Sequence, residues 1–149
     1  MSGAPRSGDP RVARVVTFFE QLSPADLARI GELYTPNARF KDPFNDVTGV
    51  IPIRQVFEHM YCALDQPRFV VCDIVAEGDQ CFLTWDFRFR FKRFSPNAEQ
   101  VVHGGSHLRF AADGRIALHR DYWDAAEELY EKLPALGALM RWVKRRASR

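Results

Sequence analysis

Apolar residues recur at three- and four-residue spacing in three stretches of the first 65 residues. This spacing predicts helices that bury one face. The first stretch begins at Asp9-Pro10, the second covers residues 23–34, and the third covers residues 51–65. The residues expected on the buried faces are Val12, Val15, Val16, Phe19, Leu22, Leu27, Ile30, Leu33, Tyr34, Ile53, Val56, Phe57, Met60 and Leu64.

A period of two replaces the helical period in the second half of the chain and predicts strands. The longest alternating run places apolar residues on one face and polar residues on the other, so we expect the apolar face to be inside. Those apolar residues are Leu83, Trp85, Phe87, Phe89 and Phe91. The expected strands cover residues 38–43, 67–79, 80–94, 101–110 and 115–123.

The predicted order of elements is α-α-β-α-β-β-β-β-α, which is typical of an α+β domain. We expect a cone, in which a curved antiparallel sheet wraps its apolar, concave face around the N-terminal helices and leaves a pocket at its open end. Residues 1–10 are expected to be a disordered lead-in, and residues 11–127 a single domain. Residues 128–149 are expected to be an extension of short C-terminal helices, kinked near Pro134 and Gly137 and ending in a basic tail.

Composition narrows the class of protein. The chain has 149 residues and a net charge of +2, so no overall field favours nucleic acid. Aromatic residues make up 13% of the chain, which suits a wide core or an apolar pocket. The cysteines, Cys62, Cys72 and Cys81, lack paired spacing and are expected to be reduced core residues of a cytoplasmic protein. No stretch predicts stable membrane insertion, and the tail "RWVKRRASR" is expected to be a solvated basic segment or a contact for an acidic surface.

Two short segments carry the candidate chemistry. In "RFKDPF", Asp42 lies where a strand gives way to Pro43, which suits either a general base at a cavity mouth or a turn aspartate that binds backbone N–H groups. In "HRDYWD", alternation places His119, Asp121 and Trp123 on one face of the last strand. Asp121 is either a second inward acid or a buried structural residue.

The segments "ELYTPNARFKDPF" and "HLRFAADGRIALHRDYWD", with the order of elements, resemble the nuclear transport factor 2-like superfamily. Within it the chain resembles SnoaL-like and ketosteroid-isomerase-like proteins over about residues 11–127. The resemblance implies a cystatin-like, SnoaL-like cone, with Asp42 at the position of the general base. The isomerase positions that supply a tyrosine and a protonated carboxylic acid correspond here to Phe18 and Ser106. A strict steroid isomerase is therefore not expected, because an enolate would lose its main hydrogen-bond donors.

Together these features predict an acid/base enzyme of the isomerase, cyclase or hydrolase type, acting without a cofactor or metal on a small apolar cyclic or polyketide-like substrate. Asp42 and Asp121 are the expected catalytic residues. A non-catalytic module that binds a hydrophobic ligand or a partner remains an open alternative. We also expect a homodimer formed through the convex face of the sheet. The expected substrate-binding residues are Phe18, Phe57, Trp85, Phe87, Ser106, Leu108, His119 and Trp123.

Overall fold

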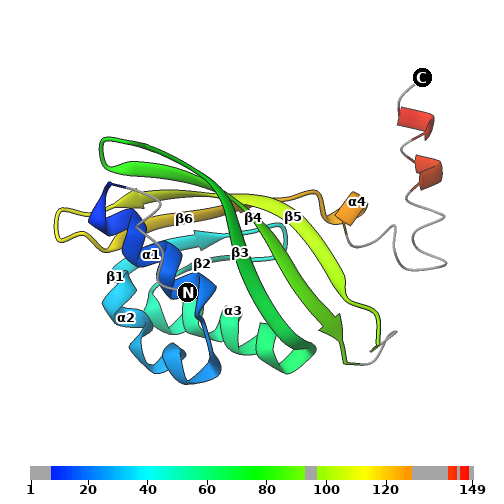
Figure 1. Cartoon of the computed structure of the whole chain (residues 1–149), viewed down its shortest axis with the longest axis horizontal. Helices are drawn as coiled ribbons and strands as arrows, with labels where there is room; N and C mark the ends of the chain where they lie inside the picture. The colour runs from blue at the N-terminus through cyan, green and yellow to red at the C-terminus, as the bar shows by residue number, and fades with distance from the viewer. Residues whose placement is uncertain (1–7, 93–96, 129–140, 144, 148–149) are drawn as a thin grey trace.

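A computed structural model describes residues 8–92, 97–128, 141–143 and 145–147 of the chain. The helical segments of the N-terminal half, which include α1 (Pro10–Glu20) and α3 (Val50–Ala63), lie against one side of a curved, open sheet, as Figure 1 shows. The α+β class and the curved sheet around N-terminal helices are confirmed. The helical elements are α1 (Pro10–Glu20), the 3-10 helix η1 (Pro24–Arg29), α2 (Ile30–Leu33), α3 (Val50–Ala63) and α4 (Ala125–Glu128).

The sheet has six strands in the order β2-β1-β6-β5-β4-β3. Four of its neighbouring pairs are antiparallel, as expected, but β1 runs parallel to β6, with Phe40 opposite His119. This pair joins segments far apart in the chain, so no turn between them could reveal its direction. The strands are β1 (Tyr34–Lys41), β2 (Asp46–Thr48), β3 (Leu64–Glu77), β4 (Gln80–Phe91), β5 (Gln100–Phe110) and β6 (Ile116–Tyr122).

The alternating pattern along β4 places apolar side chains in the core, as expected. Leu83, Trp85 and Phe89 are buried in the core, whereas Arg88 on the opposite face is partly exposed. The helices supply the other side of this core, with Val12 and Val15 of α1 and Ile53 of α3 fully buried. The concave face of the sheet is thus the apolar one, and the site described below lies there.

Several boundaries differ from the sequence-based expectation. The chain enters β1 at Tyr34, so the helix expected over residues 23–34 is divided and ends earlier. The short strand β2 forms where a turn was expected. Asp9 caps α1 by accepting a hydrogen bond from the backbone N–H of Arg11, so ordered structure begins inside the expected lead-in.

Two further expectations concern the cysteines and the C-terminus. The prediction of three core cysteines was wrong, because only Cys81 is buried and the other two are exposed. Cys62 and Cys72 lie on faces of α3 and β3 that the apolar pattern does not cover. Within the expected extension the structure places the end of α4 and short helical stretches at 141–143 and 145–147. The kink expected near Pro134 and Gly137 lies outside the described residues.

Candidate functional site

An apolar cavity of about 330 Å³ lies between α3 and the concave face of the sheet. This volume is at the lower end of the range for small-molecule sites, roughly 300–1,000 Å³. We call it the aromatic cavity, because aromatic rings form half of its lining. It is lined by Phe40, Asp42, Phe44, Asn45, Val56, Phe57, His59, Met60, Ala63, Leu64, Phe69, Trp85, Phe87, Phe89, Phe91, Val102, Asp121 and Trp123.

Two further hollows adjoin the same region. An inner chamber of about 20 Å³, large enough for about one water molecule, is lined by Ser106, Leu108 and His119 among others. A shallow outer depression of about 620 Å³ is lined by Lys41, Arg120 and their neighbours. Of the residues that the structure describes, Asp121 alone borders all three hollows.

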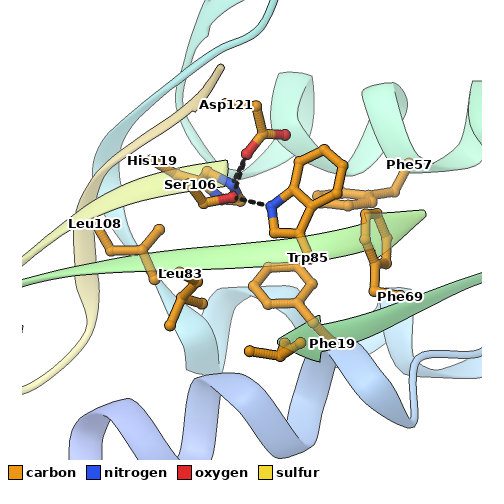
Figure 2. Close-up of a pocket in the computed structure, with 10 residues that line it drawn as sticks. Phe19, Phe57, Phe69, Leu83, Trp85, Ser106, Leu108, His119 and Asp121 are labelled. Carbon is orange, nitrogen blue, oxygen red and sulfur yellow. Dashed lines mark hydrogen bonds and ion pairs between the residues drawn. The ribbon is translucent and has the colours of Figure 1, made fainter. Parts of the chain in front are cut away.

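Asp121 ends two runs of hydrogen bonds, whose outer links, Trp85 to Ser106 and Tyr34 to His119, are buried. On one side, the indole N–H of Trp85 donates to Ser106 Oγ at 2.8 Å, and Ser106 Oγ donates to Asp121 Oδ1 at 2.5 Å. On the other side, His119 Nε2 lies 2.7 Å from Asp121 Oδ1, and Tyr34 Oη lies 2.6 Å from His119 Nδ1. Figure 2 shows Ser106 and His119 meeting at the same carboxylate oxygen. Four side chains from four strands thus hold one acid.

The direction of these bonds follows from the donors available. Burial, with a smaller contribution from the negative charge of Asp121, raises the pKa of the Tyr34 phenol well above its ordinary value. Tyr34 therefore keeps its proton, and its O–H donates a hydrogen bond to His119 Nδ1. His119 Nε2 then carries a proton and donates to Asp121, an arrangement in which each ring nitrogen has a partner. Asp121 Oδ1 consequently receives two hydrogen bonds.

The second oxygen of Asp121 is turned away from this network. Its side chain is only 15% exposed, and Oδ2 has no hydrogen-bond partner within the part of the chain that the structure describes. Figure 2 shows it pointing away from Ser106 and His119. A carboxylate held by one oxygen and open at the other can accept a proton from a bound molecule, donate one to it, or pair with a positive charge.

Asp42 is held differently. Its Oδ1 accepts hydrogen bonds from the backbone N–H groups of Phe44 and Asn45, at 2.8 and 2.7 Å. The amide nitrogen of Asn45 lies 3.1 Å from each carboxylate oxygen. Asp42 therefore stabilises the turn between β1 and β2, as the second sequence-based alternative describes, while it also borders the aromatic cavity and the outer depression.

The model of the SnoaL-like domain family matches residues 15–119, which is most of the chain and includes most of the strands that build the site. The chain belongs to the SnoaL-like domain family. The resemblance noted in the sequence is thereby confirmed at the level of the family. Among curated proteins, no sequence matches this SnoaL-like protein significantly.

Solved structures with the same fold show how widely the SnoaL-like protein's architecture is shared. A ketosteroid isomerase-like protein of Catenulispora acidiphila, in complex with trimethylamine, has a TM-score of 0.69 at 15% identity, covering 83% of this chain and 92% of its own. TerC, co-crystallised with polyporic acid, has a TM-score of 0.68 at 13% identity, covering 80% and 95%. A candidate SnoaL-like polyketide cyclase of Jannaschia sp. CCS1 has a TM-score of 0.67 at 18% identity, covering 82% and 93%. At these identities the likeness shows the fold alone.

Seven of the eight predicted substrate-binding residues of the SnoaL-like protein line the aromatic cavity, the inner chamber or both. Phe87 and Trp123 line the aromatic cavity, Ser106, Leu108 and His119 line the inner chamber, and Phe57 and Trp85 line both. Phe18 lines neither, because it lies beside the cavity-facing side of α1 and packs edge-on against Phe19, with ring centroids 5.6 Å apart. Phe19 is the α1 ring that borders the inner chamber.

Tyr34 and Phe69 are among the residues of this site that reasoning from sequence missed. Tyr34, expected on a helix, begins β1 and reaches His119. Phe69 lines both the aromatic cavity and the inner chamber, and its ring stacks on Phe87 with centroids 4.6 Å apart. The alternation along residues 67–79 gave a signal for Phe69, since it shares a face with Val71. Tyr34 gave no such signal.

Two absences can be stated for the described ranges, 8–92, 97–128, 141–143 and 145–147. They contain no group of three or more histidine, cysteine or carboxylate side chains arranged to hold a metal ion. None of their helices is long and apolar enough to cross a membrane.

Proposed function

We propose that this SnoaL-like protein is a cofactor-independent acid/base enzyme that moves a proton within a small apolar, cyclic or polyketide-like molecule. Asp121 is the catalytic group in this proposal, and His119 and Ser106 position it. The observation that carries the proposal is the free oxygen of Asp121, held by its other oxygen at the meeting point of three hollows.

The chemistry requires only one such group. Asp121 Oδ2 takes a proton from a carbon next to a carbonyl, and the resulting acid returns the proton to another atom of the same molecule. No electrons enter or leave, so isomerase and cyclase chemistry are both served without a cofactor. Asp42, whose oxygens already serve the turn, lies at the rim and contributes to binding.

Proton exchange offers a test that does not require the natural substrate. The bicyclic ketone 2-tetralone has acidic C–H groups, whose loss of ¹H NMR signal in D₂O reports proton abstraction. We expect the wild-type protein to accelerate this exchange, and Asp121→Asn to reduce the acceleration by about 10²–10⁴-fold. Asp42→Asn is the matched control, because asparagine can also serve the turn, and it should retain exchange within about tenfold. Equal exchange by wild type and Asp121→Asn would refute the proposal.

A second candidate is a non-catalytic module that binds an apolar ligand. It is favoured by the engagement of both Asp42 oxygens in the turn, which leaves a single free acid, and by Phe18 and Ser106 at the isomerase donor positions. Two of the structural neighbours hold small molecules, an amine in one and an acid in the other, so binding itself is common to both candidates. Binding of 2-tetralone without accelerated exchange would favour this module.

A further inference from the structure

The charges around the aromatic cavity are of one sign. Its described lining contains nine aromatic rings and two carboxylates, those of Asp42 and Asp121, but no lysine or arginine. The one histidine in the lining, His59, belongs to an exposed position on α3. A bound molecule therefore meets negative charge and the faces and edges of rings.

Three cationic side chains of β1 and β6, those of Arg39, Lys41 and Arg120, lie outside the lining of the aromatic cavity. Lys41 and Arg120 line the outer depression, and the Arg120 guanidinium lies over the ring of Tyr122, 4.7 Å from its centroid. Tyr122 is exposed on the convex side of the sheet, so this guanidinium is directed out of the aromatic cavity. Arg39 is paired with Asp46, at 2.8 Å.

Asp121 is a largely enclosed carboxylate, 15% exposed, and no lysine or arginine among the described residues pairs with it. Ser106 and His119 each give it one hydrogen bond, and the Tyr34 hydroxyl that faces His119 Nδ1 leaves Nε2 as the nitrogen that donates to Asp121. A buried carboxylate without a counter-charge is costly, and the cost falls when a cation pairs with it. Aromatic rings add to the attraction, since their faces carry partial negative charge.

We propose that the aromatic cavity binds an apolar molecule that carries a basic nitrogen, whose protonated form pairs with Asp121 Oδ2. The ring-lined wall takes the apolar body and Asp121 takes the ammonium group. Anions of similar shape are rejected, because both carboxylates of the lining would repel them. The inference rests on the proposed function only in taking the aromatic cavity as the binding site, and it holds whether or not Asp121 transfers a proton.

Three probes with the same ring system and different charge test it. At pH 7, 2-naphthylmethylamine is a cation, 2-naphthylmethanol is neutral and 2-naphthoate is an anion. Each is titrated into the ¹⁵N-labelled full chain, and binding is followed at the indole N–H of Trp85, which lies in the cavity wall. We expect the amine to bind at least about tenfold more tightly than the alcohol, and the naphthoate to bind most weakly.

Two variants test which carboxylate produces the preference for the cationic probe. Asp121→Asn should bring the amine to the affinity of the alcohol, while Asp46→Asn, at an exposed carboxylate outside the cavity lining, should retain the preference. Should Asp121→Asn fail to fold, the three probes on the wild-type protein still decide the question. Equal or tighter binding of the alcohol or the naphthoate would overturn the charge preference and leave the proposed function standing. No binding by any of the three would overturn the cavity as the binding site, and with it both proposals.

Discussion

His119 Nε2 lies 2.7 Å from Asp121 Oδ1, two positions further along β6. Residues two apart on a strand point to the same face, so both side chains enter the concave side of the sheet together. His119 is also enclosed by rings, with Phe40 and Phe19 edge-on to it at 4.8 and 5.5 Å. The acid is thereby oriented by a neighbour that has little freedom to move.

The first prediction concerns Tyr34, the far end of this network. In Tyr34→Phe the buried Nδ1 of His119 loses its donor, and an unsatisfied buried group typically costs about 1–3 kcal/mol. We expect the free energy of unfolding, measured by urea denaturation, to fall by that amount. The ¹⁵N shifts of the His119 ring should show that the proton is no longer confined to Nε2. Unchanged ring shifts would mean that Tyr34 does not fix the tautomer.

The second prediction is a dependence of stability on pH. The folded-state pKa of Tyr34 is raised well above its ordinary value of 10.0 by burial and by Asp121. The contribution of Tyr34 to stability is therefore complete below about pH 10 and is lost as the pH rises above it, because the unfolded chain then releases a proton that the folded chain retains. Burial likewise raises the pKa of Cys81, to about 11, which adds a loss that begins near pH 9.

Comparison of two variants between pH 8 and pH 12 separates these contributions. Tyr34→Phe should show a shallower decline in unfolding free energy above pH 10 than the wild type, with the Cys81 component remaining. Tyr122→Phe, at an exposed position, should follow the wild type. If the unfolding free energies of wild type and Tyr34→Phe declined in parallel above pH 10, burial would not be raising the pKa of Tyr34.

Part of the site could be predicted from the sequence, because His119 and Asp121 lie two residues apart on the same strand. Alternation along residues 115–123 is enough to place His119 and Asp121 on one face. Tyr34 is 85 positions from His119 in the chain, and their contact depends on the parallel pairing of β1 with β6, which leaves no local pattern. On α1, adjacent residues point about 100° apart, so an alignment that selects Phe18 instead of Phe19 selects a different face.

Asp42 shows a second limit of prediction from sequence. The sequence supported both a base and a turn residue, because aspartate before proline suits either. Its hydrogen bonds are decided by the course of the chain through Phe44 and Asn45. The family resemblance could give the position of Asp42. It could not show that both of its carboxylate oxygens accept hydrogen bonds within the turn.

The third prediction concerns Gly104, where β5 passes beneath the indole of Trp85. A Cβ at this position would lie 2.5 Å from the ring, closer than real contacts allow. Gly104→Ala should therefore displace Trp85 and break its hydrogen bond to Ser106, at a cost of about 1–3 kcal/mol for the overpacking. The indole N–H resonance of Trp85 should shift, and the thermal midpoint should fall. Gly8→Ala, with open space around it, is the matched control and should leave both unchanged.

The last prediction is the homodimer. Val75, Phe82 and Tyr122 form an exposed apolar patch on the convex face, where Val75 is opposite Phe82 in the β3–β4 ladder and the rings of Phe82 and Tyr122 are 6.4 Å apart. Contiguous apolar surface of this kind is commonly an interface. We expect the wild type to sediment as a dimer at micromolar concentration and Val75→Lys to sediment as a monomer, because the new charge would be buried without a partner. Ile51→Lys, equally exposed but on the helical side, should remain dimeric. A wild-type monomer at that concentration would show that this patch serves no second copy of the chain.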